Sequence, residues 1–74
     1  NPVKDRMNIR MGKEVQGKIG VTLYNTGGTQ VWESAETISP FGPAQVDLSR
    51  LPGGSYVVVV KYNGKEYKNN IVKL

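Results

Sequence analysis

The sequence predicts an all-β domain, a small antiparallel sandwich of six or seven strands. Apolar residues recur at every second position over several short stretches, which is the period of a strand with one buried face. Nine glycines and four prolines punctuate the chain and separate these stretches, as short strands joined by tight turns require. No longer stretch shows the period of a helix, and 74 residues make one domain.

The first half of the chain contains three predicted strands. In the first strand, residues 3–11, the side chains predicted to point into the core are Val3, Met7, Ile9 and Met11. In the second strand, residues 15–24, the side chains predicted to point into the core are Val15, Ile19, Val21 and Leu23. The glycines within this strand predict a bend or bulge. The turn Asn25-Thr26-Gly27-Gly28 leads into the third, residues 29–35, where neighbouring Val31 and Trp32 leave the inward residue undecided.

The second half begins with a loop, because Ser39-Pro40-Phe41-Gly42-Pro43 holds two prolines within four residues. A short strand follows, in which Ala44, Val46 and Leu48 alternate with polar residues, and Leu51-Pro52-Gly53-Gly54 forms a tight corner. Residues 55–62 form the next strand. Its run of four valines is apolar on both faces, which predicts a central strand covered on both sides.

Asn63-Gly64 is the strongest local signal and predicts a two-residue type I′ hairpin between the last two strands. This turn fixes the cross-strand pairs Tyr62 with Lys65, Lys61 with Glu66, and Val60 with Tyr67. Strict continuation would set Asn69 against Val58 inside the core. We therefore expect a bulge near Asn69-Asn70 that shifts the phase.

The composition argues against an enzyme. The chain has no His and no Cys, which removes most routes to nucleophilic and acid–base catalysis, as well as disulfides and thiolate metal sites. Its six acids are scattered without a calcium-loop pattern, and its glycine pairs do not precede helices, so no metal or cofactor is predicted. The net charge of +4 is spread without a basic run, and no apolar stretch approaches the ~18 residues of a membrane-spanning helix.

Two side chains are assigned structural roles. The Asp47 carboxylate is positioned to accept hydrogen bonds from the backbone of Ser49 or Arg50 and so hold the corner. Tyr56 resembles the tyrosine corner of immunoglobulin-like sandwiches, in which the hydroxyl bonds to upstream backbone; the alternative is an ordinary core tyrosine. The predicted fold is thus a small immunoglobulin-like antiparallel β-sandwich.

Basic and aromatic residues gather around the last hairpin at Lys61, Tyr62, Lys65, Tyr67 and Lys68. Such interleaving occurs in surfaces that bind single-stranded nucleic acid. The cluster is small and includes Glu66, so we favour a solubilised hairpin and expect no nucleic-acid partner.

Four segments, in order, resemble the C-terminal sorting domains of the Bacteroidetes type IX secretion system. They are Asn1-Pro2-Val3 with Met7-Asn8-Ile9, then Val21-Thr22-Leu23-Tyr24-Asn25, then residues 47–58 (DLSRLPGGSYVV), and the tail from Lys68 to Leu74. The positions that carry the family motif or its turns are Asn1, Pro2, Asp47, Leu48, Gly54, Tyr56, Asn63 and Gly64. The sequence departs from the family at Asn69-Asn70, where further lysine is common.

The resemblance implies a non-catalytic sorting signal, with residues 1–74 forming one domain of a longer secreted protein. Such a domain follows its cargo and directs it from the periplasm across the outer membrane to the cell surface or the medium. The implied partners are the outer-membrane translocon, a shuttle protein, a sortase-like peptidase and the N-terminal cargo. The implied recognition residues lie in the tail, at Lys68, Ile71, Val72, Lys73 and Leu74. If Asn69-Asn70 interrupts the ladder, this tail frays and adds to the edge of a receptor sheet, with Ile71 and Leu74 filling pockets.

Two alternatives remain open at this point. An accessory carbohydrate-binding or adhesive module of a secreted enzyme would present an aromatic platform, for which the candidates are Trp32, Phe41 and Tyr24. A structural spacer between other domains would need no exposed site at all.

Overall fold

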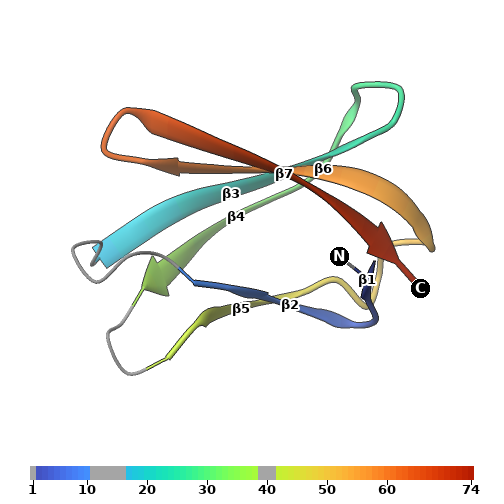
Figure 1. The fold of residues 1–74 in the computed structure, drawn as a ribbon, viewed down its shortest axis with the longest axis horizontal. Helices are drawn as coiled ribbons and strands as arrows, with labels where there is room; N and C mark the ends of the chain where they lie inside the picture. The colour runs from blue at the N-terminus through green and yellow to red at the C-terminus, as the bar shows by residue number, and fades with distance from the viewer. Residues whose placement is uncertain (1, 11–16, 39–41) are drawn as a thin grey trace.

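The fold, seen in a computed structural model that describes residues 2–10, 17–38 and 42–74, consists of seven strands in two sheets (Figure 1). Their bounds are β1 Pro2–Val3, β2 Arg6–Ile9, β3 Gly17–Asn25, β4 Gln30–Ile38, β5 Ala44–Asp47, β6 Gly54–Tyr62 and β7 Lys65–Lys73. One sheet has five strands in the order β1-β7-β6-β3-β4, and the other pairs β2 with β5. The predicted all-β sandwich is confirmed. No helix among the described residues is long and apolar enough to cross a membrane.

The core lies between the two sheets, since β2 and β5 run beneath one face of the five-stranded sheet (Figure 1). Alternate residues of each strand point into it, as the period of two predicted. The buried apolar residues are Met7, Ile9, Ile19, Val21, Leu23, Ile38, Ala44, Val46, Leu48, Tyr56, Val58, Val60 and Ile71. We call the face of the five-stranded sheet that points toward β2 and β5 the inner face, and the opposite one the outer face.

The predicted first strand is two strands that belong to different sheets. A bend at Lys4 and Asp5 carries the chain from β1, beside β7, down to β2, beside β5. The β1–β7 pair is parallel, and the remaining pairs are antiparallel. Asp5, an exposed acid at an inward position between Val3 and Met7, interrupts the period-two alternation at this bend, but a single interruption does not by itself indicate a change of sheet. The predicted contributions of Met11 and Val15 lie outside the described residues.

The bulge expected at a glycine of the second strand lies elsewhere. In the β3–β4 ladder the register shifts between Leu23 and Tyr24, which pair with Trp32 and Gln30, so Val31 is the extra residue. A bulge lets two successive residues turn toward the same side. Val31 and Trp32 accordingly both pack against the core, which explains why alternation did not decide between them.

The last hairpin forms as predicted, with positive φ angles of 50° at Asn63 and 78° at Gly64. All three predicted cross-strand pairs are present. The bulge expected at Asn69-Asn70 is wrong, because the ladder runs without a shift from Tyr62–Lys65 to Gly54–Lys73. Asn69 does lie on the inner face opposite Val58, but it is exposed. The two-stranded sheet is too short to cover this part of β7. The Asn69 side chain therefore faces solvent, and no bulge is needed to keep it out of the core.

β6 is central in its sheet, as its four valines predicted, with β7 and β3 on either side. Its outer face is not covered by a second layer of described strands. Val59 is nevertheless only 5% exposed, because it lies between Thr22 of β3 and Lys68 of β7 in a cross-strand row. The long aliphatic part of a lysine can shield an apolar neighbour while its amine stays in water.

Candidate functional site

The last two residues of β7, Val72 and Lys73, are paired on both edges of the strand. β6 pairs with it along its whole length, and β1 pairs with Val72 and Lys73 on the other side. The backbone amide of Leu74 adds a hydrogen bond to the carbonyl of Val3 at 2.7 Å. Both ends of the chain thus lie side by side in one sheet (Figure 1). The premise that the tail frays at Asn69-Asn70 is therefore wrong for this fold.

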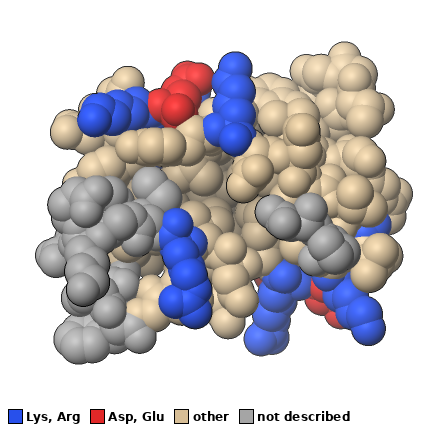
Figure 2. Space-filling view, in the orientation of Figure 1, with Lys and Arg blue, Asp and Glu red and all other residues tan. Residues whose placement is uncertain are grey.

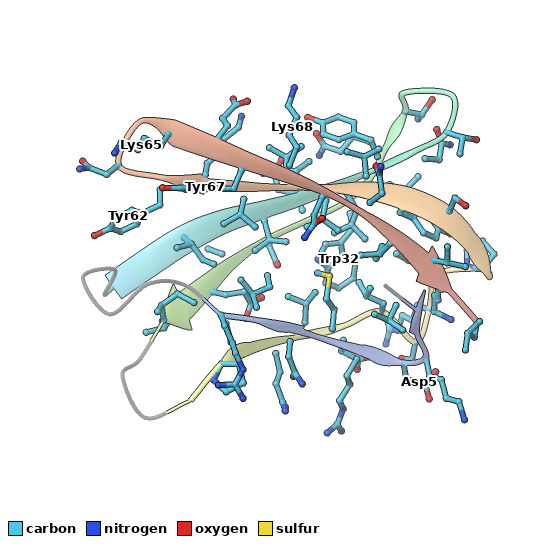
Figure 3. All side chains as sticks on the ribbon, in the orientation of Figure 1. Asp5, Trp32, Tyr62, Lys65, Tyr67 and Lys68 are labelled. Atoms are coloured by element: carbon cyan, nitrogen blue, oxygen red, sulfur yellow. The ribbon has the colours of Figure 1, made fainter. Side chains whose placement is uncertain are left out.

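The predicted recognition residues point to opposite faces of the sheet, because successive residues of a strand alternate between its faces. Ile71 and Lys73 point to the inner face and are 5% and 7% exposed. Lys68 and Val72 lie on the outer face, where both are exposed, and Leu74 at the chain end is exposed as well. Figure 3 shows Lys68 pointing away from β2 and β5. Of the five predicted recognition residues, Lys68, Val72 and Leu74 are therefore the ones whose side chains are exposed in the folded domain.

Among the described residues, the exposed large apolar side chains lie on β7 and the residue that follows it, with Tyr67 on the inner face and Val72 on the outer face. They are Tyr67, Val72 and Leu74, with exposed fractions of 45%, 45% and 67%. A small domain normally scatters such residues over its surface. Their concentration within the last eight residues marks β7 as the surface best suited to contact with a partner.

Residues 47–56 lie next to the end of β7 and support it; we call this segment the cradle. The Asp47 carboxylate accepts a hydrogen bond from the Ser49 amide at 2.9 Å, as predicted, and the Leu51 amide closes the turn on the Leu48 carbonyl. Leu48 itself is fully buried, and its amide binds the Asp5 carbonyl at 2.7 Å. The Ser49 backbone bond, helped by the Ser49 side chain, lowers the pKa of Asp47 below its ordinary 3.8.

The second half of the cradle touches the terminal strand directly. The Tyr56 hydroxyl donates to the Pro52 carbonyl at 2.5 Å, which confirms the predicted tyrosine corner. A Cβ added at Gly53 would lie 3.3 Å from the Lys73 carbonyl oxygen, so only glycine fits without displacing the strand end. Gly54, with φ of 151°, pairs with Lys73. Gly53 therefore allows close approach of the terminal backbone, whereas Gly54 provides a backbone conformation that other residues rarely adopt.

A shallow depression of about 350 Å³ lies on the outer face next to β7. Its lining comes from β3, β6, β7 and the turn after β3, and comprises Tyr24, Asn25, Thr26, Gly28, Val57, Val59, Lys61, Glu66 and Lys68. Lys61 and Glu66 form an exposed ion pair at 3.8 Å, the pair that the hairpin register predicted. The depression extends the exposed surface of β7 toward the middle of the sheet.

The other predicted surfaces do not assemble. Trp32 lies on the inner face between the sheets (Figure 3), with its indole donating to Ser34 at 3.2 Å. Tyr24 pairs with Val57 of β6 and lies on the outer face. Phe41 is outside the described residues. Because Trp32 and Tyr24 occupy opposite faces, they form no aromatic platform.

The basic-aromatic cluster around the last hairpin is likewise divided. Lys61 and Lys68 lie on the outer face, and Tyr62, Lys65 and Tyr67 on the other. Figure 2 shows positive side chains on both the upper and lower sides of the molecule, with acids beside them. This dispersion disfavours a nucleic-acid surface. Within the described ranges, no group of three or more acidic side chains is placed to hold a metal ion.

One element of the site was missed in the sequence: the pairing of β1 with β7. Val3 was identified as a core residue, but the parallel partner of a two-residue strand leaves no local pattern in the sequence. Asn1, a predicted motif position, lies outside the described residues. Pro2 lies in β1, where a proline is tolerated because β1 is an edge strand.

Comparison with known proteins identifies the family of the chain. No curated protein and no solved structure matches the chain. The family model described as the secretion system C-terminal sorting domain matches residues 1–74, the whole chain. The chain therefore belongs to this family, the C-terminal sorting domains of type IX secretion.

Proposed function

We propose that this domain is the signal that directs an N-terminal cargo protein across the outer membrane through the type IX system, and that it is read as a folded domain through β7. Family membership supports a sorting signal for a secreted protein that is attached to an N-terminal cargo. The single observation that favours β7 as the surface that is read is the presence of exposed Tyr67 and Val72 on that strand and of exposed Leu74 directly after it.

Within this proposal the five tail residues have two different tasks. Lys68, Val72 and Leu74 contact the partner, because their side chains are exposed. Ile71 and Lys73 hold the strand in place, since they are buried against the core and the cradle. Burial of an isoleucine contributes about 1.5–3 kcal/mol to folding, so drawing Ile71 out to fill a receptor pocket would oppose the stability of the domain.

The partners in this proposal are the outer-membrane translocon, a shuttle protein that carries the domain, and a sortase-like peptidase that removes it. The route runs from the periplasm to the cell surface or the medium. Residues 1–74 form one domain that follows the cargo, and its function is to be recognised; sorting domains of this family are generally non-catalytic.

The accessory-module alternative is not favoured, because the aromatic residues proposed for its platform occupy opposite faces of the sheet. A spacer would give no reason for three exposed apolar side chains on one strand.

The proposal is tested by fusing residues 1–74 to a periplasmic reporter in a bacterium that has type IX secretion. The fusion should appear at the cell surface or in the medium, and the reporter without the domain should stay in the periplasm. A fusion that is folded, as shown by resistance to periplasmic proteolysis, and still remains in the periplasm would overturn the proposal.

A further inference from the structure

β7 is paired unequally on its two edges. β6 covers all nine of its residues, whereas β1 covers only Val72 and Lys73. Along residues 66–70 no described strand lies on the β1 side, and every side chain in this stretch is exposed. An edge with unpaired backbone groups is a template for an additional strand. We call residues 66–70 the open edge.

The direction of the free backbone groups follows from the hydrogen bond at the end of β7. The Leu74 amide points to β1, since it binds the Val3 carbonyl. Successive residues of a strand direct their backbone groups to opposite edges. Glu66, Lys68 and Asn70 therefore present their N–H and C=O groups to the open edge, while Tyr67 and Asn69 bond to β6.

The course of β1 indicates what fills this edge. β1 runs parallel to β7, with Pro2 opposite Val72 and Val3 opposite Lys73. A segment that precedes Asn1 and continues this register falls opposite Asn70, Asn69 and so on back to Glu66. The sorting-domain family attaches its members to an N-terminal cargo, so such a segment is the link between cargo and domain.

We propose that the cargo-side linker extends β1 as a parallel edge strand along the open edge of β7, next to the surface that the secretion system reads. This inference rests on the proposed function in one respect: it requires a cargo protein that precedes Asn1. The linker is tethered at the correct register, so its docking avoids the loss of freedom that binding of a separate chain entails. Cleavage of the linker would then uncover the open edge.

A second copy of the chain is a poorer occupant of the same edge. Edge-to-edge pairing would bring together two chains that each carry a net charge of +4, with Lys68 in the middle of each open edge. Lysines on an edge strand are a common protection against such self-association.

The experiment compares backbone amide exchange by NMR in residues 1–74 and in the same domain preceded by about ten natural residues of its parent protein. In the longer chain the amides of Glu66, Lys68 and Asn70 should exchange about tenfold more slowly, because they gain partners. The amides of Tyr67 and Asn69 should not change, because β6 already protects them. This alternation identifies strand pairing and excludes a general increase in stability.

A matched variant of the longer chain carries proline at alternate upstream positions, which removes the donors that a parallel strand needs. It should restore the fast exchange of Glu66, Lys68 and Asn70. Equal exchange in the long and short chains would overturn the inference, as would protection in residues 1–74 alone that rises with protein concentration, which indicates a second copy. Exchange is measured on purified protein, so its result is independent of whether the reporter fusion is exported.

Discussion

The backbone amide of Leu74 donates to the carbonyl of Val3 at 2.7 Å, so the last residue of the domain is fastened to one of the first. Val3 also packs against the core, and its strand, β1, pairs with β7 on the edge opposite β6. The surface proposed for recognition is therefore positioned by the segment that faces the cargo.

Deletion of residues 1–3 should lower the free energy of unfolding by about 2 kcal/mol, because it removes a half-buried valine and the β1–β7 hydrogen bonds. Amide exchange at Val72 and Leu74 should accelerate more than exchange in β3. Val3→Ser keeps the backbone bond and should have a smaller effect, measured by urea titration. Equal stability of the deletion variant and the unchanged domain would show that β1 does not hold the terminal strand.

Tyr56→Phe should destabilise the domain by about 1 kcal/mol, because the Pro52 carbonyl loses its hydroxyl partner while the ring still fills the core. The control is Tyr67→Phe, which alters an exposed tyrosine and should change the free energy of unfolding by less than about 0.5 kcal/mol. Denaturant titration of both variants checks the difference. Similar values for the two would mean that the corner hydrogen bond contributes little.

Asp47→Asn should destabilise the domain near neutral pH and have little effect in acid. The Ser49 amide favours the ionised carboxylate and lowers the pKa of Asp47 in the folded state. The stabilisation is therefore present above the ordinary pKa of 3.8 and is lost as pH falls through the lower folded value. Melting temperatures of the two proteins should converge below pH 3.8. A difference that stays constant with pH would contradict this role.

Gly64→Ala should destabilise the domain by about 1 kcal/mol, because φ of 78° forces an L side chain into the left-handed region. Gly20→Ala provides a matched control in a strand. There φ is not positive, and the new Cβ would meet Lys61 at an ordinary 3.9 Å, so this change should be neutral or stabilising. Thermal melting of both variants gives opposite signs if the turn geometry is correct.

Local turn chemistry made the last hairpin predictable, since Asn63-Gly64 sets the register of β6 and β7 without help from the rest of the fold. The corner at Asp47 and Tyr56 was predictable for the same reason, because its partners lie within four residues. The bulge at Asn69-Asn70 was wrong because alternation shows which residues share a face but not how far the opposing sheet extends.

The candidate site was only partly predictable. The tail was identified through its family resemblance, but all five of its residues were treated alike. Ile71 and Val72 differ in burial because one faces the core and the other the solvent, and this depends on the register with β6. The β1–β7 pairing joins residues from opposite ends of the chain and has no local signal.

The most direct test of the account is the surface-exposed fraction of a reporter fused to residues 1–74 in which Lys68→Ser, Val72→Thr and Leu74→Ser are combined. The matched control combines Lys18→Ser, Ala35→Ser and Thr37→Ser, three changes at exposed positions of β3 and β4 away from β7. Both variants should melt close to the unchanged domain, because none of these residues is fully buried. The account predicts that the β7 variant stays in the periplasm while the control reaches the surface; equal export of the two would contradict it.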